Sequence, residues 1–528
     1  MTTSVMRCSI ILAVAFVALA CENVRSKPPA ATDRITVVVA LGTEPGQLNP
    51  AITTGGGVHP ITDQIFNGLV GLDEQLNPVP ELAERWDIAE EGQVYTFHLR
   101  RGVTWHDGAP FTAADVVFTF DQVLLKYHSR TRAGLGPALE RIESPDDSTV
   151  VFRFKYPYAP LLQRLDVTEA SILPKHVYGD GRDMLTHPAN QRPVGTGPFV
   201  FSDYVRGHRI VLDRNTHYFR PGLPGVDRVV FRILPSAATA SLALESGDVD
   251  YISSVPGPDL TRFRTQSEFR VVQSTGGSGG SICQEVFIPN LARPPLDRLD
   301  VRRAIYSAID RDFIAERVYF GQGVAATGPV SSRHPWAYIA PATRYPHDVA
   351  LANQLLDRAG LRRGPDGMRV TLSFAHAANQ ARLADVLRDQ LRAVGIVLRL
   401  EPLDFNAAVD RVFVKKDFDF GFASFCNGAD PDIGVRRVYS SSNIGPIPFS
   451  NGAGYRNSAV DSLFSAAAST IDRARRRELY GRIQSLVAED LPYFWLFDSA
   501  PYRAWRATFT EFRPWSGAFM EAVRPVMP

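Results

Sequence analysis

Two groups of residues in this sequence have the types and the spacing of catalytic side chains. The first is His106-Asp107, a histidine beside a carboxylate, the combination that serves as a general base in acyl transfer. The second is the tract GGSGG at residues 276–280, which matches the G-x-S-x-G pattern of a hydrolase nucleophile at Ser278. Either group would make the protein an exported hydrolase.

The elements around both groups argue against catalysis. Neighbouring residues of an extended segment point to opposite sides, so His106 and Asp107 do not easily form a dyad, and Asp107-Gly108 is a turn signal. A nucleophile elbow needs a helix after its serine, whereas residues 281–288 continue as strand-like sequence. No segment offers a base oriented next to a nucleophile. We therefore expect no catalytic residue and keep the hydrolase as the less favoured alternative.

The sequence from residue 82 to residue 125 predicts a strand, two turns and an amphipathic helix. Tyr95, Phe97 and Leu99 alternate with polar residues, which is the period of a half-buried strand. Thr112 is a typical helix N-cap, and Asp115 stands at the capping-box position ahead of apolar residues at helical spacing. Between these elements, we expect the Trp105 side chain to pack in the protein core.

The same stretch resembles the signature region of the bacterial extracellular solute-binding proteins of family 5, the peptide- and nickel-binding components of ABC importers. The family pattern is roughly LA..W....DG..YTF.LR.GV.WHDG.P.TA.DV..T, and residues 82–116 supply most of its defined positions. Further segments resemble the same family, including VGTGPF at 194–199 and the block at 290–314, so that the resemblance extends over about residues 35–497.

The resemblance implies an α/β protein with the two-lobed fold of periplasmic binding proteins and an extra subdomain in the first lobe. Helix and strand patterns also alternate between residues 348 and 432, which predicts a parallel sheet covered by helices. The expected organisation is a signal peptide at 1–20, a tether at 21–32, a first lobe at 33–275 with its subdomain at about 61–178, a second lobe at 276–492 with the first hinge in the glycine tract, and a C-terminal return to the first lobe at 493–528.

The N-terminus predicts export. Arg7 precedes an apolar run at residues 10–20 that is too short to span a bilayer but has the length of a signal segment. Cys21 follows Ala20, which resembles a lipoprotein site with the lipid on Cys21; simple cleavage near Ala20 is the alternative. We expect a protein of the periplasm or the outer face of the cell envelope, tied to a membrane only through such a lipid.

The remaining cysteines of the exported chain are Cys283 and Cys426. An even number of cysteines in an oxidising compartment suggests a disulfide. Both residues lie in strand-like segments of the same expected lobe, so a Cys283–Cys426 bridge is one interpretation and two buried thiols are the other.

The composition of the chain restricts the kinds of molecule that it can be expected to bind. The formal net charge is +1 and no Lys/Arg block occurs, which argues against nucleic acid. The 11 histidines are scattered without ligand spacing, so we expect neither a metal site nor a cofactor. The resemblance implies a monomer that delivers a small solute, an oligopeptide or peptide-like molecule, to the transmembrane subunits of an ABC permease. A metal chelate, a sugar or an amino-acid conjugate is the alternative solute.

Candidate ligand-binding residues lie in three loops. Thr53, Thr54 and Gly55 stand in a glycine-rich loop that precedes a predicted helix, where free backbone N–H groups can receive an anion. The other two loops follow strands of the predicted parallel sheet, where ligands of such sheets bind. They contribute His376 and Asn379, and Phe425, Asn427 and Asp430.

The last of these loops departs from peptide-binding relatives. They usually carry a Trp followed three residues later by an Asp that holds the α-ammonium group of the peptide. This sequence has Phe425 and Gly428 at those places, and Asn427 or Asp430 would substitute only in a shifted loop. A neutral amide holds an ammonium group less well than a carboxylate does. The departure argues against an ordinary peptide with a free N-terminus and leaves the transport role untouched.

Overall fold

The structure is a computed structural model that describes residues 34–53, 56–274 and 282–526. The expected signal segment, tether and Cys21 lie outside the described residues, as do Thr54, Gly55, Ser278 and the expected hinge. In the described part, no helix combines the length and the apolar character needed to cross a membrane.

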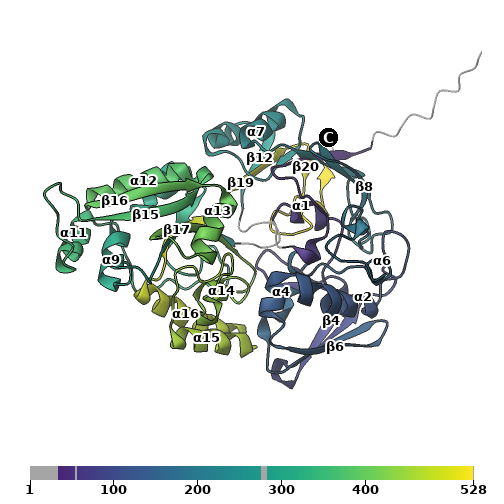
Figure 1. Cartoon of the computed structure of the whole chain (residues 1–528). Coiled ribbons are helices and arrows are strands. Elements are labelled where there is room, and N and C mark those ends of the chain that lie inside the picture. Colours follow the sequence, from purple (N-terminus) through teal and green to yellow (C-terminus); the bar gives the residue numbers. More distant parts are fainter. Residues whose placement is uncertain (1–33, 54–55, 275–281, 527–528) are drawn as a thin grey trace, which may run out of the picture. The chain divides into compact units, whose positions relative to one another are not determined.

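The first lobe is built on a seven-stranded mixed sheet with strands from both ends of the chain (Figure 1). In spatial order the strands are β12 (Phe269–Gln273), β19 (Tyr502–Arg506), β11 (Tyr251–Ile252), β1 (Thr36–Leu41), β10 (Arg228–Ile233), β9 (Arg209–Arg214) and β8 (Phe199–Val205). β1 is parallel to β10 and β11, whereas β19 is antiparallel to β11 and β12. The C-terminal strand β19 thus completes the first lobe.

A four-stranded antiparallel sheet lies in the segment expected to form the subdomain. Its order is β4 (Ala83–Ala89), β5 (Val94–Leu99), β7 (Thr149–Phe154) and β6 (Leu139–Asp146). The predicted strand is β5, and the predicted helix begins as α2 (Ala113–Phe118). The Thr112 N–H donates to Asp115 Oδ2 at 2.9 Å, as a capping box requires. Trp105 is 1% exposed and packs edge-on against Phe111, so its structural interpretation is confirmed.

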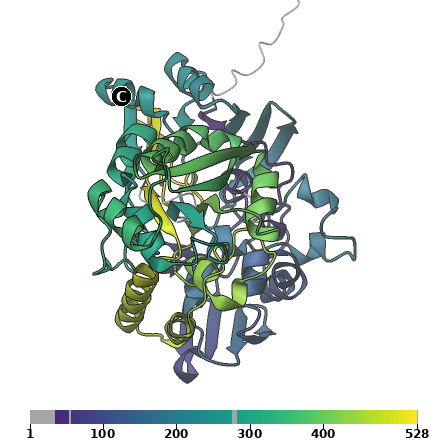
Figure 2. The same ribbon diagram turned by 60° about the vertical axis from the view of Figure 1, so that its left-hand side comes forward.

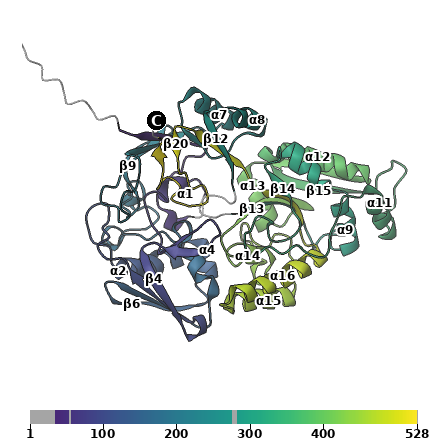
Figure 3. The same cartoon turned by 180° about the vertical axis from the view of Figure 1, so that it is seen from behind.

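The second lobe contains a six-stranded mixed sheet. Its order is β14 (Gly323–Ala325), β18 (Phe494–Ser499), β13 (Ile282–Pro289), β17 (Phe420–Asn427), β15 (Val370–Ala377) and β16 (Ile396–Leu403). β15 is parallel to both β16 and β17, as the alternating pattern predicted. Helix α12 (Ala381–Ala393) packs on β15 and β16, and α15 (Ser458–Ser469) runs beside α16 (Arg473–Asp490) (Figure 3).

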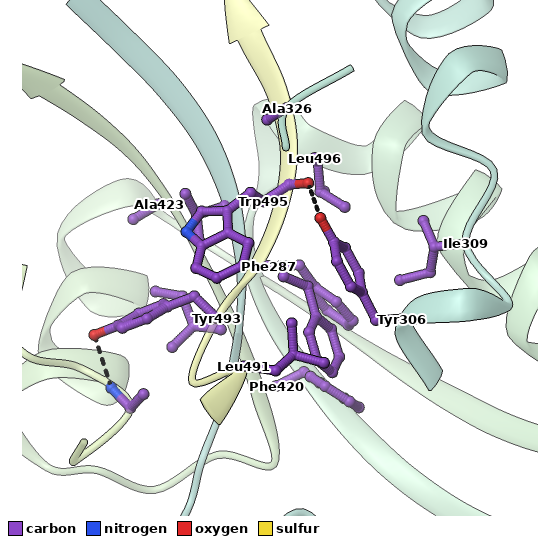
Figure 4. Close-up of a cluster of buried hydrophobic side chains, with 14 of the residues drawn as sticks. Phe287, Tyr306, Ile309, Ala326, Phe420, Ala423, Leu491, Tyr493, Trp495 and Leu496 are labelled. Atoms are coloured by element: carbon purple, nitrogen blue, oxygen red, sulfur yellow. Dashed lines mark hydrogen bonds between the residues drawn. The ribbon is translucent and has the colours of Figure 1, made fainter. Parts of the chain in front are cut away.

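The return to the first lobe begins one strand later than expected. β18 pairs with β13 and β14 of the second-lobe sheet, where it is the yellow strand among teal and green strands in Figure 2. Its side chains explain this position, because Trp495 and Leu496 are fully buried in the core of the second lobe (Figure 4). Tyr306 Oη also donates to Trp495 O at 2.7 Å. The chain crosses at Ala500 and re-enters the first lobe as β19.

An ionic cluster fastens the C-terminal segment to the first lobe. Arg220 pairs with Glu81 and, through Nη1, with Glu521 Oε1 at 2.6 Å. Tyr218 Oη donates to the same Glu521 oxygen at 2.6 Å. Burial raises the pKa of Glu81 to about 7, with Arg220 opposing the shift and Glu521 adding to it. The cluster therefore shares one arginine between two carboxylates.

Glu285 should make the stability of the protein depend on pH. It lies in β13 and accepts from Ser424 Oγ at 3.0 Å, while burial raises its pKa to about 7. The folded state therefore holds this proton more tightly than the unfolded chain, where Glu titrates near pH 4.3. Its contribution to the free energy of unfolding should fall by about 3.5 kcal/mol as pH rises from about 4 to about 8 and stay constant at higher pH. Urea unfolding of wild type and Glu285→Gln at pH 5 and pH 8 measures this contribution, and the two proteins should differ in their pH dependence. An equal change in the free energy of unfolding between pH 5 and pH 8 in the two proteins would contradict this role of Glu285.

Candidate functional site

The loop that follows β17, residues 428–434, is folded on itself. The Gly428 N–H donates to Ile433 O at 2.7 Å, and the Asp432 N–H donates to Asp430 Oδ1 at 2.9 Å. Gly434 has a φ of +120°, and a Cβ at that position would collide with Asn427. A glycine is therefore needed where the loop enters α14 (Val435–Tyr439), and the loop holds Asp430 and Asp432 in fixed directions.

Asp430 is neutralised inside the second lobe. Its side chain is fully buried and accepts hydrogen bonds from Tyr480 Oη at 2.9 Å and from Arg476 Nη2. Both partners belong to α16, and Arg476 Nε also donates to Ala467 O at 3.0 Å. Burial lowers the pKa of Arg476, but the Asp430 carboxylate raises it more, so the guanidinium stays charged. Asp430 therefore supports the loop.

Asp432 joins the two lobes. Its Oδ2 accepts from Tyr158 Oη at 3.2 Å and from Arg164 Nη2 at 3.1 Å, both in the first lobe. Its Oδ1 accepts from Arg436 Nη1 at 3.0 Å in its own lobe. Burial raises the pKa of Asp432, but Arg164 and Arg436 lower it more, so the net shift is downward and the carboxylate is charged. Arg164 Nε also donates to Tyr158 Oη at 2.6 Å, which orients the two first-lobe donors.

A cavity of about 580 Å³ lies beside this contact and is lined by residues of both lobes. Its charged lining consists of Arg130, Arg164, Arg436, Arg437 and the single carboxylate Asp432. Tyr156, Tyr158, Ser442, Asn443 and Ser465 add polar and aromatic surface. A larger cavity of about 630 Å³ is lined by first-lobe and C-terminal residues, among them Glu81 and Arg220. Because that cavity receives no residue from the second lobe, the arginine-lined cavity is the candidate binding site.

Two residues expected in the loop after this strand, Phe425 and Asn427, lie within β17 itself, because the strand runs three residues further than the sequence predicted. Phe425 is 3% exposed and packs edge-on against Phe413 and Tyr493 in the core of the second lobe. Asn427 is buried, and its Oδ1 has no hydrogen-bond partner among the described residues.

The other expected ligand-binding residues lie elsewhere. His376 is buried at the end of β15, where its Nδ1–H donates to Ala377 O at 2.9 Å, and Asn379 is exposed in the following turn. Thr53 is half-buried after the short helix η1 (Pro50–Ile52). None of the described candidates lines the arginine-lined cavity, so their role as ligand contacts stays a prediction.

The arginines of the cavity were not predicted from the sequence. Arg130 lies in α4 (Ser129–Gly134), Arg164 in the short helix η4 (Ala159–Arg164), and Arg436 and Arg437 in α14. No spacing rule links these segments. The available signal was Asp430-Pro431-Asp432, two carboxylates in the loop after a predicted sheet strand.

His106 and Asp107 have separate partners. His106 Nε2–H donates to Gly197 O at 3.0 Å, while its Nδ1 accepts from the Gly195 N–H at 3.2 Å. Burial lowers the pKa of His106 to about 4, so the ring is neutral. Asp107 Oδ2 instead pairs with His176 Nε2 at 2.7 Å. The two side chains serve the turn and the packing around it.

Cys283 and Cys426 are joined by a disulfide between neighbouring strands. They face each other in the antiparallel pair of β13 and β17. The bridge lies at the end of β17, one residue before the strand gives way to the loop that holds Asp430 and Asp432. Within the described residues, no group of three or more histidine, cysteine or carboxylate side chains is arranged to hold a metal ion.

Comparison with known proteins identifies the family. The model of the bacterial extracellular solute-binding proteins, family 5 Middle, matches residues 77–446. Di/tripeptide-binding protein 1 of Pseudomonas aeruginosa is 28% identical over 499 residues, 89% of this chain and 90% of that protein. Heme-binding protein A of Haemophilus influenzae is 30% identical and covers 87% of this chain and 86% of its own. The solved structure of the periplasmic binding protein DppA from Helicobacter pylori with the peptide STSA has a TM-score of 0.80, 26% identity and coverage of 93% and 98%.

The chain belongs to the bacterial extracellular solute-binding proteins of family 5, since the family model covers more than half of it. The α/β two-lobed fold expected from the sequence is confirmed by the structural match. Members of this family bind solutes, so the chain is a binding protein and not an enzyme.

Replacing Arg476 by methionine should strongly destabilise the protein. Arg476→Met keeps most of the side-chain volume but leaves the buried Asp430 carboxylate without its counter-charge. We expect the free energy of unfolding to fall by roughly 3–5 kcal/mol, measured by urea unfolding at pH 7. Arg475→Met is the matched control, because Arg475 is exposed on the same helix and pairs with Glu478 at the surface; its effect should stay within about 0.5 kcal/mol. Equal effects of the two changes would contradict the role assigned to Arg476.

Proposed function

We propose that this protein is the extracytoplasmic solute-binding component of an ABC importer and that its solute is a peptide or a peptide-like molecule. The observation that carries the proposal is a polar cavity between two lobes of a family 5 chain, with a charged contact between the lobes at its edge. The peptide class is supported by the relative named as a di/tripeptide-binding protein and by the structural match that holds a peptide.

Capture is proposed to use closure of the two lobes around the solute. A closed state is favoured when both lobes contribute contacts to it. Asp432 supplies such a contact, because it receives Tyr158 and Arg164 from the first lobe and Arg436 from the second. A solute in the adjoining cavity adds contacts with Arg130 on one side and Arg437 on the other. The ligand and the ion pair then stabilise the same closed state.

The proposed site of action, outside the cytoplasmic membrane, is supported by the N-terminal sequence and by the family. Export through the segment at residues 1–20, with a lipid on Cys21 or cleavage near Ala20, puts the binding lobes outside the cytoplasmic membrane. The proposed protein acts as a monomer and hands its solute to the transmembrane subunits of its permease. A non-peptide solute is the second candidate, and it is favoured by the absence of an acidic residue at Gly428.

A thermal-shift screen of the mature protein tests the proposed function. The panel contains di- to pentapeptides, metal chelates, sugars and amino-acid conjugates. We expect at least one peptide to raise the melting temperature, because a ligand that binds only the native state stabilises it by about 2.7 kcal/mol at 100 times its Kd. A shift caused only by another class would overturn the peptide assignment, and no shift from any class would contradict the binding role of the mature protein.

A further inference from the structure

We propose that the arginine-lined cavity is an anion site in which Arg437, together with Arg130, holds a carboxylate of the solute, so that the protein selects acidic peptide-like solutes. This inference rests on the proposed function and names the chemistry of its substrate.

The charge of the cavity lining points to an anionic ligand. Four arginines line it, against the single carboxylate Asp432. Three of these arginines already have ionic partners: Arg164 and Arg436 bind Asp432, and Arg130 Nη1 binds Glu169 Oε1 at 3.0 Å. Glu169 does not line the cavity. A surplus of positive charge therefore faces the space between the lobes.

The arginine of the cavity that has no ionic partner among the described residues is Arg437. Among the described residues, its guanidinium has no ion pair and no hydrogen bond, and its buried Nε is unpartnered. Burial and the nearby Arg130 lower the pKa of Arg437 to about 10, against a smaller opposing effect of Glu169, so the side chain remains charged at neutral pH. Arg437 as a whole is half-buried, so its charge is partly withdrawn from water without a partner, which is costly. A ligand that supplies the opposite charge removes that cost.

The chemistry of the guanidinium defines the ligand group. A guanidinium group presents paired N–H donors in a plane, which match the two oxygens of a carboxylate. Arg437 comes from α14 of the second lobe and Arg130 from α4 of the first. A carboxylate between them would neutralise the second lobe's unpaired cation and contact both lobes at once.

The neighbouring loop offers no competing attraction for a cationic solute. Asp430 is enclosed by Arg476 and Tyr480, and Asp432 is enclosed by Arg164, Tyr158 and Arg436. An incoming ammonium group would have to displace one of these arginines. The loop therefore offers no unpaired carboxylate that could replace the acidic residue which peptide-binding relatives carry at the position of Gly428.

The test uses two probes of equal size and the mature wild-type protein. N-acetyl-alanyl-glutamate carries two carboxylates and no ammonium group, and N-acetyl-alanyl-glutamine amide is its neutral counterpart. Isothermal titration calorimetry should detect binding of the acidic probe and at least tenfold weaker binding of the neutral one. Equal affinity for both probes would overturn the proposal without any variant being made.

The variant Arg437→Gln tests whether this side chain causes the preference for the acidic probe. The variant should bind the acidic probe at least tenfold more weakly, Arg437→Lys should lose less, and Arg475→Gln, exposed on α16, should bind as wild type does. An unchanged affinity in Arg437→Gln would also overturn the proposal. If the protein binds peptides with an affinity that does not depend on their charge, the proposed function holds and this inference is wrong. If it binds no member of the thermal-shift panel, both the proposed function and this inference are wrong.

Discussion

The carboxylate of Asp432 is the interaction on which the rest of the binding site depends. It is charged, almost fully buried, and shared by donors from two lobes whose strands belong to different sheets. A buried carboxylate is tolerated only when its oxygens are satisfied, and here Arg164, Tyr158 and Arg436 satisfy them. The same contact defines one edge of the arginine-lined cavity, so closure and the shape of the cavity are physically linked.

The support for this carboxylate comes from within the second lobe. The loop that carries Asp432 is attached to β17, folded by its own backbone hydrogen bonds, and anchored to α16 through Asp430 and Arg476. The Cys283–Cys426 disulfide ties β17 to β13 immediately before the loop. A rigid loop keeps Asp432 in place. Little of the free energy of the contact between the lobes is then offset by the entropy cost of ordering the loop.

The elements that the sequence predicted are those with a local signal. The strand around Tyr95 and the capping box of Thr112 follow from periodicity and cap chemistry, and the family resemblance gave the two-lobed fold. The membership of β18 was missed because an apolar strand buried on both faces does not reveal which sheet it joins. The aromatic Phe425, expected at the ligand, lies in the core.

The arginine-lined cavity could not be predicted for a different reason. Arg130 and Arg164 of the first lobe are joined by Arg437 only where the second lobe meets the first. A surface arginine also looks the same in a sequence as a buried one. Asp430 and Asp432 stand two residues apart, yet only the fold shows that one is enclosed within its lobe and the other joins the lobes.

A double-mutant cycle on Arg164 and Asp432 measures whether these two side chains hold the lobes together. The free energies of unfolding of wild type, Arg164→Met, Asp432→Asn and the double variant give the coupling between the two side chains. We expect a favourable coupling of about 2 kcal/mol, because the pair is buried and charge-assisted. Additive effects of the two substitutions would contradict a direct contact between the lobes at Asp432.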